Sequence, residues 1–294
     1  MKKAIAVFLC VFMFSALFIS CKKDDGKNAY TVYDTLSYNF DSAYAYDDAT
    51  VRTYKDLCDA VVKGKEEIRI NAGVLDNALQ LFYTSFPLSV LVEDIKPSGS
   101  AYIIIYKNKG TLDDDVYKFI ESVNNIKGKC NNENKTVYAI KLYSYLSSSV
   151  EISENTGISC FETITKGEGT SFSYANMFEY LLQQNGIKAY HILCEDMGGN
   201  SKAISAAELD GKLYYFDLFS EYNDNQGKLL KYFGMTTEDA QNFGLHKFIY
   251  TNHNTADDAS DLKFEPCRIC REWEIDGDNL LITRSDDKIV QVAL

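Results

Sequence analysis

The chain has 294 residues, of which 42 are acidic and 30 basic, so its formal charge is −12. A field of that sign repels phosphate groups, and we therefore exclude nucleic acid as an expected partner. The length exceeds one typical domain and is sufficient for one large or two modest domains with a sizeable core.

The first twenty residues have the composition of a signal peptide. Lys2 and Lys3 precede a nearly unbroken apolar run over residues 4–19, which is shorter than the run of about 20 residues that a spanning helix needs. Cys21 follows immediately and is succeeded by a strongly polar stretch at 22–25. Cleavage before Cys21 would remove the two lysines and leave 28 basic and 42 acidic residues, a formal charge of −14.

The residues around the predicted cleavage point resemble a bacterial lipobox. Ser20 is the small residue that this motif has just before the cysteine, but Phe18 stands where the strict form has leucine. The resemblance implies that residues 1–20 are a lipoprotein signal peptide, that Cys21 carries a lipid, and that residues 21–29 tether the chain to a membrane of the bacterial cell envelope, on the periplasmic side or at the surface. The alternatives are an uncleaved signal anchor and an ordinary secretory signal with an incidental cysteine.

Six further cysteines follow, an even number that permits disulfides in an exported chain, but their wide scatter leaves the pairing open. They are Cys58, Cys130, Cys160, Cys194, Cys267 and Cys270. The single C-x-x-C, Cys267 and Cys270, lacks the second pair of ligands that a structural zinc site needs. Residues 264–275 have the pattern of a strand, in which residues three apart face opposite ways. We expect two ordinary thiols or separate disulfides there rather than a redox pair, and we expect neither a metal site nor a cofactor.

Residues 30–128 alternate short strand-like and helix-like segments, which predicts a small α+β module. Asp113, Asp114 and Asp115 open one of its helices, where negative charge is favourable at the positive end of the helix dipole, and we do not assign them to a metal. The predicted strands and helices of the module lie at 30–40, 53–63, 67–70, 75–83, 88–92 and 101–106.

Residues 129–294 begin with a predicted helix at 133–147. A second helix, at 172–184, is entered through a glycine-rich loop and ends at Asn185-Gly186. Asp210-Gly211 is a strong hairpin signal, and a closing hairpin turns at 276–279. Three strands are predicted between that helix and the closing hairpin, at 187–194, 202–209 and 212–218.

Three segments of this region carry a recognisable pattern. Residues 169–175 read GTSFSYA, the helix ends at Gly186-Ile187, and residues 209–217 read LDGKLYYFD. They resemble the core of the bacterial transglutaminase-like superfamily, whose usual text is G-x-C-x-G-Y-A, then H-A-W-N, then L-D-G-K-W-Y-x-x-D. The resemblance covers about residues 137–243 and implies a papain-like α+β domain at 129–294, in which a helix packs on an antiparallel sheet.

Enzymes of that family use three residues that lie in these segments. A cysteine at the helix start is held as a thiolate, a histidine shuttles the proton, and an aspartate orients the imidazole. Residue by residue, the resemblance places Ser171 at the cysteine, Lys202 at the histidine and Asp217 at the aspartate. Shifting the alignment with the family's pattern does not restore the triad. Cys160 lies eleven residues before Ser171, and His191 lies eleven residues before Lys202.

The replaced residues do not support the family's chemistry. A serine hydroxyl ionises far less readily than a thiol and needs a base, and a charged lysine has no lone pair to offer it. We therefore expect no catalytic residue. Ser171 is predicted to be the N-cap of the helix, and Asp217 is predicted to accept hydrogen bonds or to pair with Lys202.

Three functions remain open on the sequence. The first is a catalytically inactive transglutaminase-like domain, held at the membrane through the lipid on Cys21, which binds an envelope protein, a peptide or a glycan in its former cleft. The second is an active peptidase or acyltransferase that uses Ser171 with a desolvated Lys202. The third is a structural envelope protein in which the domain only spaces other parts.

Overall fold

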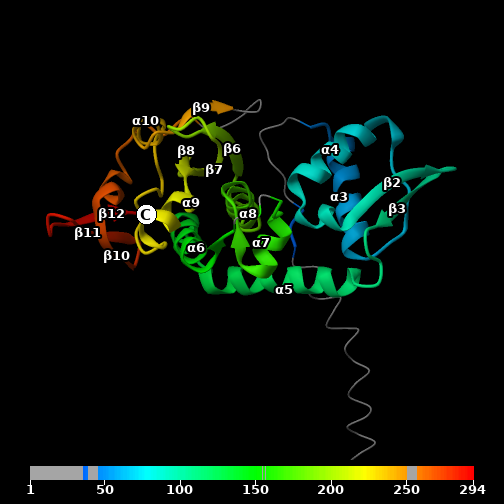
Figure 1. The fold of residues 1–294 in the computed structure, drawn as a ribbon, viewed down its shortest axis with the longest axis horizontal. Coiled ribbons are helices and arrows are strands. Elements are labelled where there is room, and N and C mark those ends of the chain that lie inside the picture. Colours follow the sequence, from blue (N-terminus) through cyan, green and yellow to red (C-terminus); the bar gives the residue numbers. More distant parts are fainter. Residues whose placement is uncertain (1–35, 39–45, 154, 156, 250–256) are drawn as a thin grey trace, which may run out of the picture. The chain divides into compact units, whose positions relative to one another are not determined.

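The computed structural model describes residues 36–38, 46–153, 155, 157–249 and 257–294. The predicted signal peptide, Cys21, the tether and most of the predicted strand at 30–40 lie outside these residues. Residues Ser37–Leu294 form one compact unit, and the division predicted at residue 128 stays a prediction. Helices and mainly antiparallel sheets make up this unit, which confirms the α+β class (Figure 1). Of the helices that the structure describes, none has both the length and the apolar character needed to cross a bilayer.

The first described part contains two helices and a small antiparallel sheet. Helix α3 (Asp48–Val62) begins five residues before the predicted start, because the Asp47 carboxylate accepts hydrogen bonds from the Ala49 and Thr50 amides, both at 2.9 Å. Helix α4 (Leu75–Ser85) follows near its predicted place. The sheet has the order β1-β3-β2, with β1 at Glu67–Ile68, β2 at Val92–Ser98 and β3 at Ala101–Tyr106.

The strand predicted at 88–92 is wrong. Residues Pro87–Leu91 form the 3-10 helix η3, which Pro87 opens, and the strand begins only at Val92. Proline has no amide hydrogen and a fixed φ, so it suits the first turn of a helix and not the interior of a sheet. Pro87 therefore makes this apolar run a helical turn rather than a strand.

Three helices lead into the centre of the fold. The acidic turn at 113–115 opens α5 (Leu112–Cys130), as predicted. Helix α6 (Lys135–Ser149) is capped by Asn134, whose side chain accepts from the Thr136 and Val137 amides. It is buried on most of its sides. Helix α7 (Cys160–Lys166) was not predicted; it has a capping box formed by Ser159 and Glu162.

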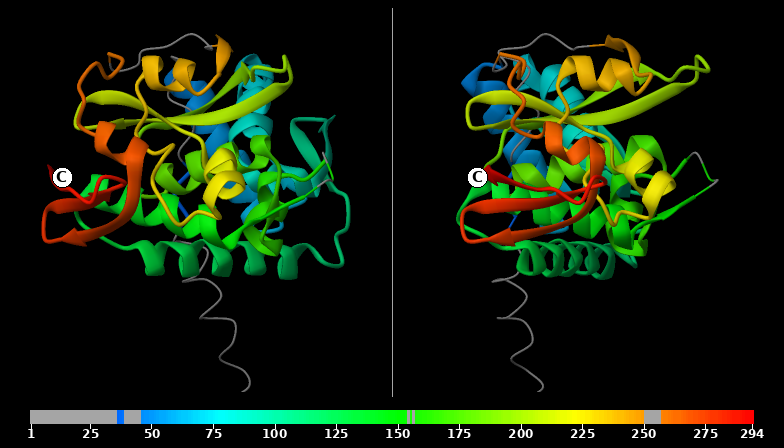
Figure 2. Two further views of the ribbon diagram at one scale, coloured as in Figure 1. Left: turned by 60° about the vertical axis from the view of Figure 1, so that its left-hand side comes forward. Right: turned by 90° about the vertical axis from the view of Figure 1, so that its left-hand side faces the viewer.

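A single helix lies on a four-stranded antiparallel sheet at the centre. Helix α8 (Ser171–Gln183) contacts β6 and β7, and the Ser205 hydroxyl of β7 donates to the Ala175 carbonyl of α8 at 3.1 Å. In both views of Figure 2 the yellow-green strands cross above the green helices, with α5 on the far side of those helices. The strand order is β8-β7-β6-β9, with β6 at Ala189–Glu195, β7 at Ser201–Leu209, β8 at Lys212–Phe216 and β9 at His246–Ile249.

The turn between β7 and β8 has the geometry that its sequence predicts. Asp210 and Gly211 both have positive φ, 53° and 76°, which matches the two-residue hairpin turn for which Asp-Gly is favoured. The register pairs Ser205 with Phe216 and Leu209 with Lys212. This register brings Lys202 on β7 and Asp217, which follows β8, to the same end of the sheet.

An aromatic cluster fills the space between α6, α8 and the sheet. Its rings meet edge-on or tilted at centroid distances from 5.0 to 6.4 Å, the arrangement that aromatic quadrupoles favour. All of them are less than 2% exposed, so the helix and the sheet are held as one rigid block. The cluster consists of Tyr143, Phe178, Phe216, Phe233 and Phe264.

The chain closes with a third antiparallel sheet. The predicted hairpin turn joins β10 (Cys270–Asp276) to β11 (Asn279–Arg284), and a further strand, β12 (Ile289–Ala293), pairs with β11. The strand predicted to begin at 264 is wrong in its first part, because Glu265–Ile269 forms the 3-10 helix η4 with a proline in its first turn.

Candidate functional site

Ser171 is the first residue of α8 but not its cap. Thr170 has the extended backbone of a cap, and its hydroxyl accepts from the Ser173 amide while the Ser173 hydroxyl accepts from the Thr170 amide at 2.8 Å. The prediction that Ser171 caps the helix is therefore wrong by one position. The Ser171 hydroxyl is partly exposed, and it makes no hydrogen bond to any residue that the structure describes.

The loop that leads into α8 requires glycine at one position. A methyl group on Gly169 would lie 2.8 Å from Cδ2 and 2.9 Å from Cε2 of Tyr174, closer than real carbon contacts allow. Tyr174 cannot move away, because it is 1% exposed and its hydroxyl donates to the Val150 carbonyl. Gly169 thus fixes the approach of the chain to Ser171.

Lys202 lies on β7 and is held by two oxygen atoms. Its Nζ is 2.5 Å from Asp217 Oδ2 and 2.6 Å from Ser220 Oγ, and its side chain is 13% exposed. The Phe219 ring lies at 5.6 Å from the same nitrogen. A lysine in its usual charged form has three donors and no acceptor.

Asp217 caps a helix. It follows β8 directly and precedes α9 (Leu218–Asn225), and its Oδ1 accepts from the Ser220 amide at 2.9 Å. Its other oxygen accepts from Lys202, and its side chain is only 2% exposed. Its carbonyl accepts from the Tyr143 hydroxyl at 3.3 Å. Both carboxylate oxygens are therefore used within the fold.

The structure thus brings two of the three family-like positions together. Lys202 and Asp217 form an ion pair, whereas neither side chain hydrogen-bonds to Ser171 in the part of the chain that the structure describes. Transfer of the Ser171 proton would need a base with a free lone pair within hydrogen-bond reach. The ammonium of Lys202 does not provide one.

A buried carboxylate and a partly exposed imidazole form a pair that the sequence did not reveal. Glu179 of α8 is 6% exposed, and its Oε2 lies 2.8 Å from Nδ1 of His191 on β6 and accepts from the His191 amide at 3.1 Å. Gln183 donates to the other carboxylate oxygen at 3.0 Å. A glutamate that is the one charged residue of α8 was the available signal, because such a group is buried only when it is paired.

The cysteines are thiols rather than thiolates. All six in the described part of the chain are free, and only Cys160 is more than marginally accessible. Burial raises the pKa of Cys160 well above its usual range, and the Glu179 carboxylate adds to this. Burial also raises the pKa of Cys270 to about 11 and that of Cys194 to about 12. None is activated for nucleophilic attack or redox exchange.

The C-x-x-C segment holds two ordinary buried thiols. Cys267 lies in η4 and Cys270 at the start of β10, and neither is in a disulfide. In the region that the structure describes, no three or more His, Cys, Asp or Glu side chains are grouped as they would be to hold a metal ion.

Comparison with known proteins gives matches among solved structures only, since no protein-family model and no curated protein matches the chain. A structure described as "a Putative Cysteine Protease from Cytophaga hutchinsonii" is 18% identical, covers 33% of this chain and 36% of its own, and has a TM-score of 0.29. A structure described as a TGase is 10% identical and has a TM-score of 0.32. The match covers 69% of this chain and 63% of the TGase chain. The chain therefore spans less than two-thirds of either solved chain. Because both TM-scores lie below 0.5, we base the function on the residues of this chain.

Proposed function

We propose that the chain carries a transglutaminase-like domain that has lost catalysis and binds a protein, a peptide or a glycan at the bacterial cell envelope. The segments at 169–175 and 209–217 support this, since they resemble the family's text and lie on α8 and on the β7–β8 hairpin. Helix α8 packs on an antiparallel sheet, as the resemblance implies for this core. The scaffold is retained while two of the three triad positions are replaced.

One observation carries the proposal of inactivity. The 2.5 Å ion pair of Lys202 with Asp217 occupies the two positions at which the family has its base and the group that orients it. Both partners are largely buried, and Asp217 also caps α9. The pair stabilises the fold and leaves Ser171 as an ordinary hydroxyl.

The anchor is the second part of the proposal. Cys21 would hold the domain at a membrane surface through its lipid, on the periplasmic side or outside the cell. The short apolar run at 4–19 and the polar stretch at 22–25 support this assignment. A ligand would then be met at that surface rather than in free solution.

Peptide hydrolysis and amine incorporation by the purified chain test the inactive assignment. We expect rates indistinguishable from the buffer blank, and no change in Ser171→Ala, because no base is available to the hydroxyl. Ser148→Ala is the matched control, since this serine is exposed and lies at the end of α6. An activity of the parent that disappears in Ser171→Ala and persists in Ser148→Ala would refute the proposal.

The low exposure of Lys202 is the observation that favours the enzyme alternative. A Ser171–Lys202 dyad requires a desolvated neutral lysine, and the side chain is only 13% exposed. However, its Nζ contacts Asp217 and Ser220 rather than Ser171.

The structural alternative, in which the domain is only a spacer, is distinguished from the binding proposal by a pull-down from the cell envelope. A reproducible partner that is displaced by mutations beside Ser171 supports binding.

A further inference from the structure

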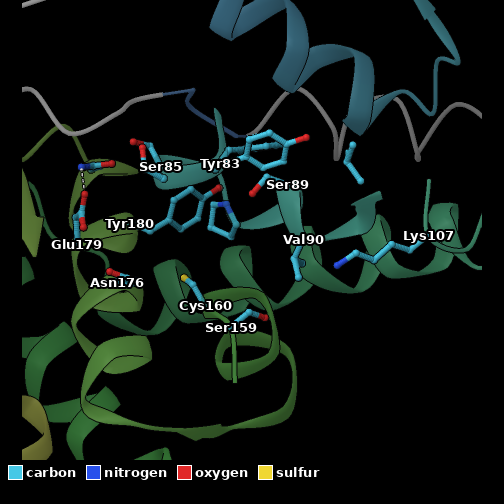
Figure 3. A pocket seen from close by; sticks show the side chains of 15 residues that line it. Tyr83, Ser85, Ser89, Val90, Lys107, Ser159, Cys160, Asn176, Glu179 and Tyr180 are labelled. Atoms are coloured by element: carbon cyan, nitrogen blue, oxygen red, sulfur yellow. Dashed lines mark hydrogen bonds between the residues drawn. The ribbon is translucent and has the colours of Figure 1, made fainter. Parts of the chain in front are cut away.

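A cavity of about 390 Å³ opens beside α8, away from the triad positions. Its walls come from the end of α4, from η3, from the start of α7 and from one side of α8 (Figure 3). Neither Ser171 nor Lys202 nor Asp217 lines it. Its volume is within the range of small-ligand sites, and its apolar wall is formed by Phe86, Pro87, Val90 and Val92.

Two polar atoms in the wall have no partner within the described chain. Tyr180 is 3% exposed, yet its hydroxyl makes no hydrogen bond to any described residue, and neither does Oδ1 of Asn176. Both residues line the cavity and project from the same side of α8 (Figure 3). An unsatisfied buried hydroxyl destabilises a fold, so its presence here points to a partner outside the described residues.

The two ends of the cavity differ in charge. Glu179 and Asn176 lie at one end and present oxygen atoms, while Lys107 lies at the other end (Figure 3). Glu179 Oε1 accepts one described hydrogen bond, from Gln183, which leaves it room for another donor. Lys107 is exposed and forms no ion pair with any carboxylate of the described residues.

We propose that this cavity binds a short peptide with free termini and apolar side chains. The peptide's ammonium group donates to Asn176 Oδ1 and to Glu179, and its carboxylate pairs with Lys107. The Tyr180 hydroxyl donates to a peptide carbonyl, and the side chains lie against the wall of Phe86 and Val90. This site goes beyond the proposed function, because it holds whether or not Ser171 is reactive.

A saccharide fits this cavity less well. A neutral sugar would offer no opposite charge to the Lys107 ammonium or to the Glu179 carboxylate, and it would bring no apolar side chain to the wall of Phe86 and Val90. A free peptide supplies one charge for each end and side chains for the wall. The arrangement is therefore complementary in charge and in polarity to a peptide.

Calorimetric titration of the purified chain tests the ligand class with defined probes. We use the dipeptide L-alanyl-L-leucine, the tripeptide L-alanyl-L-leucyl-L-alanine, their N-acetyl and C-amide derivatives, and the disaccharide of N-acetylglucosamine. At least one free peptide should bind, and N-acetylation should weaken it about 10-fold or more, since hydrogen bonds to charged groups are the strong ones. Absence of binding by both free peptides, or tighter binding of the disaccharide, would overturn the proposal.

Substitutions assign the ends of the site. Lys107→Met should weaken the free peptide about threefold and leave its C-amide derivative unchanged, because an exposed ion pair contributes little. Lys118→Met is the matched control, since this lysine is exposed on α5 and does not line the cavity. Equal effects of the two substitutions on peptide affinity would show that Lys107 is not part of the site.

Tyr180→Phe separates a binding role from a structural one. We expect peptide binding about threefold to tenfold weaker, together with a Tm that rises by about 2–4 °C, because the variant no longer buries an unpaired hydroxyl. A structural role would give the reverse, a lower Tm. A lower Tm or unchanged peptide binding in Tyr180→Phe would contradict the inference.

Discussion

Lys202→Met should lower the free energy of unfolding by about 3–5 kcal/mol, because it leaves the Asp217 carboxylate buried without its cation. Asp217 is 2% exposed, and only the Ser220 amide would remain as a donor to its side chain. The ammonium contributes a contact of 2.5 Å to one oxygen of that carboxylate. Chemical denaturation of the purified chain and of the variant gives the difference directly.

A double-mutant cycle with Asp217→Asn separates the pair from the individual residues. The double variant should lose less than the sum of the two single losses, because no uncompensated charge is left. The matched control is Lys212–Asp261, which has the same 2.5 Å distance but side chains that are 43% and 35% exposed. Lys212→Met should cost no more than about 1 kcal/mol. A loss in Lys202→Met no larger than that in Lys212→Met would show that the buried pair is not structural.

Glu221→Ala should be the second large loss, about 2–5 kcal/mol. Glu221 is fully buried in α9, where its Oε2 accepts from the Tyr143 hydroxyl and from the Tyr232 amide, both at 2.8 Å. The Asn225 side chain donates to Oε1 at 2.8 Å. Alanine would leave the Tyr232 amide without an acceptor and open a cavity beside the aromatic cluster. Glu221→Gln is the control, because it keeps an acceptor at nearly the same place.

The same residue should make stability depend on pH. Burial raises the pKa of Glu221 above its ordinary value of 4.5, and the hydrogen bonds from Tyr232 and Tyr143 offset this only in part. Below pH 4.5 the carboxyl is protonated in both states; as the pH rises, the unfolded chain loses the proton first, so Glu221 lowers stability until the raised pKa is passed. As the pH rises above 4.5 the parent should therefore lose stability relative to Glu221→Gln, until the raised pKa is passed. A gain of the parent relative to this variant over that range would contradict the assignment.

Local signals in the sequence account for the elements that were predicted well. Asp210-Gly211 fixes a hairpin because few residues adopt positive φ, and the acidic run at 113–115 marks a helix start through its charge. Where prediction failed, a single residue overrode the pattern around it. Asp47 started α3 early, and Pro87 turned an apolar run into a 3-10 helix.

Of the candidate site, the sequence predicted the pairing of oppositely charged side chains but not the cavity. A lysine and an aspartate at facing positions pair, and this was expected for Lys202 and Asp217. The cavity beside Tyr180 could not be foreseen, because its walls come from η3 and α8, which are about ninety residues apart in the chain. Contacts between such distant segments follow from tertiary packing, for which one sequence carries no local signal.

Intact-mass measurement after exposure to a serine-reactive fluorophosphonate, repeated across a range of pH, tests the central claim most directly. Lys202 Nζ contacts Asp217 and Ser220 rather than Ser171, so Ser171 has no base within reach and should form no adduct at any pH in the range. The parent and Ser171→Ala should then have identical masses. An adduct in the parent that maps to Ser171 and is absent from Ser171→Ala would show that the hydroxyl is activated and would contradict the proposed inactivity.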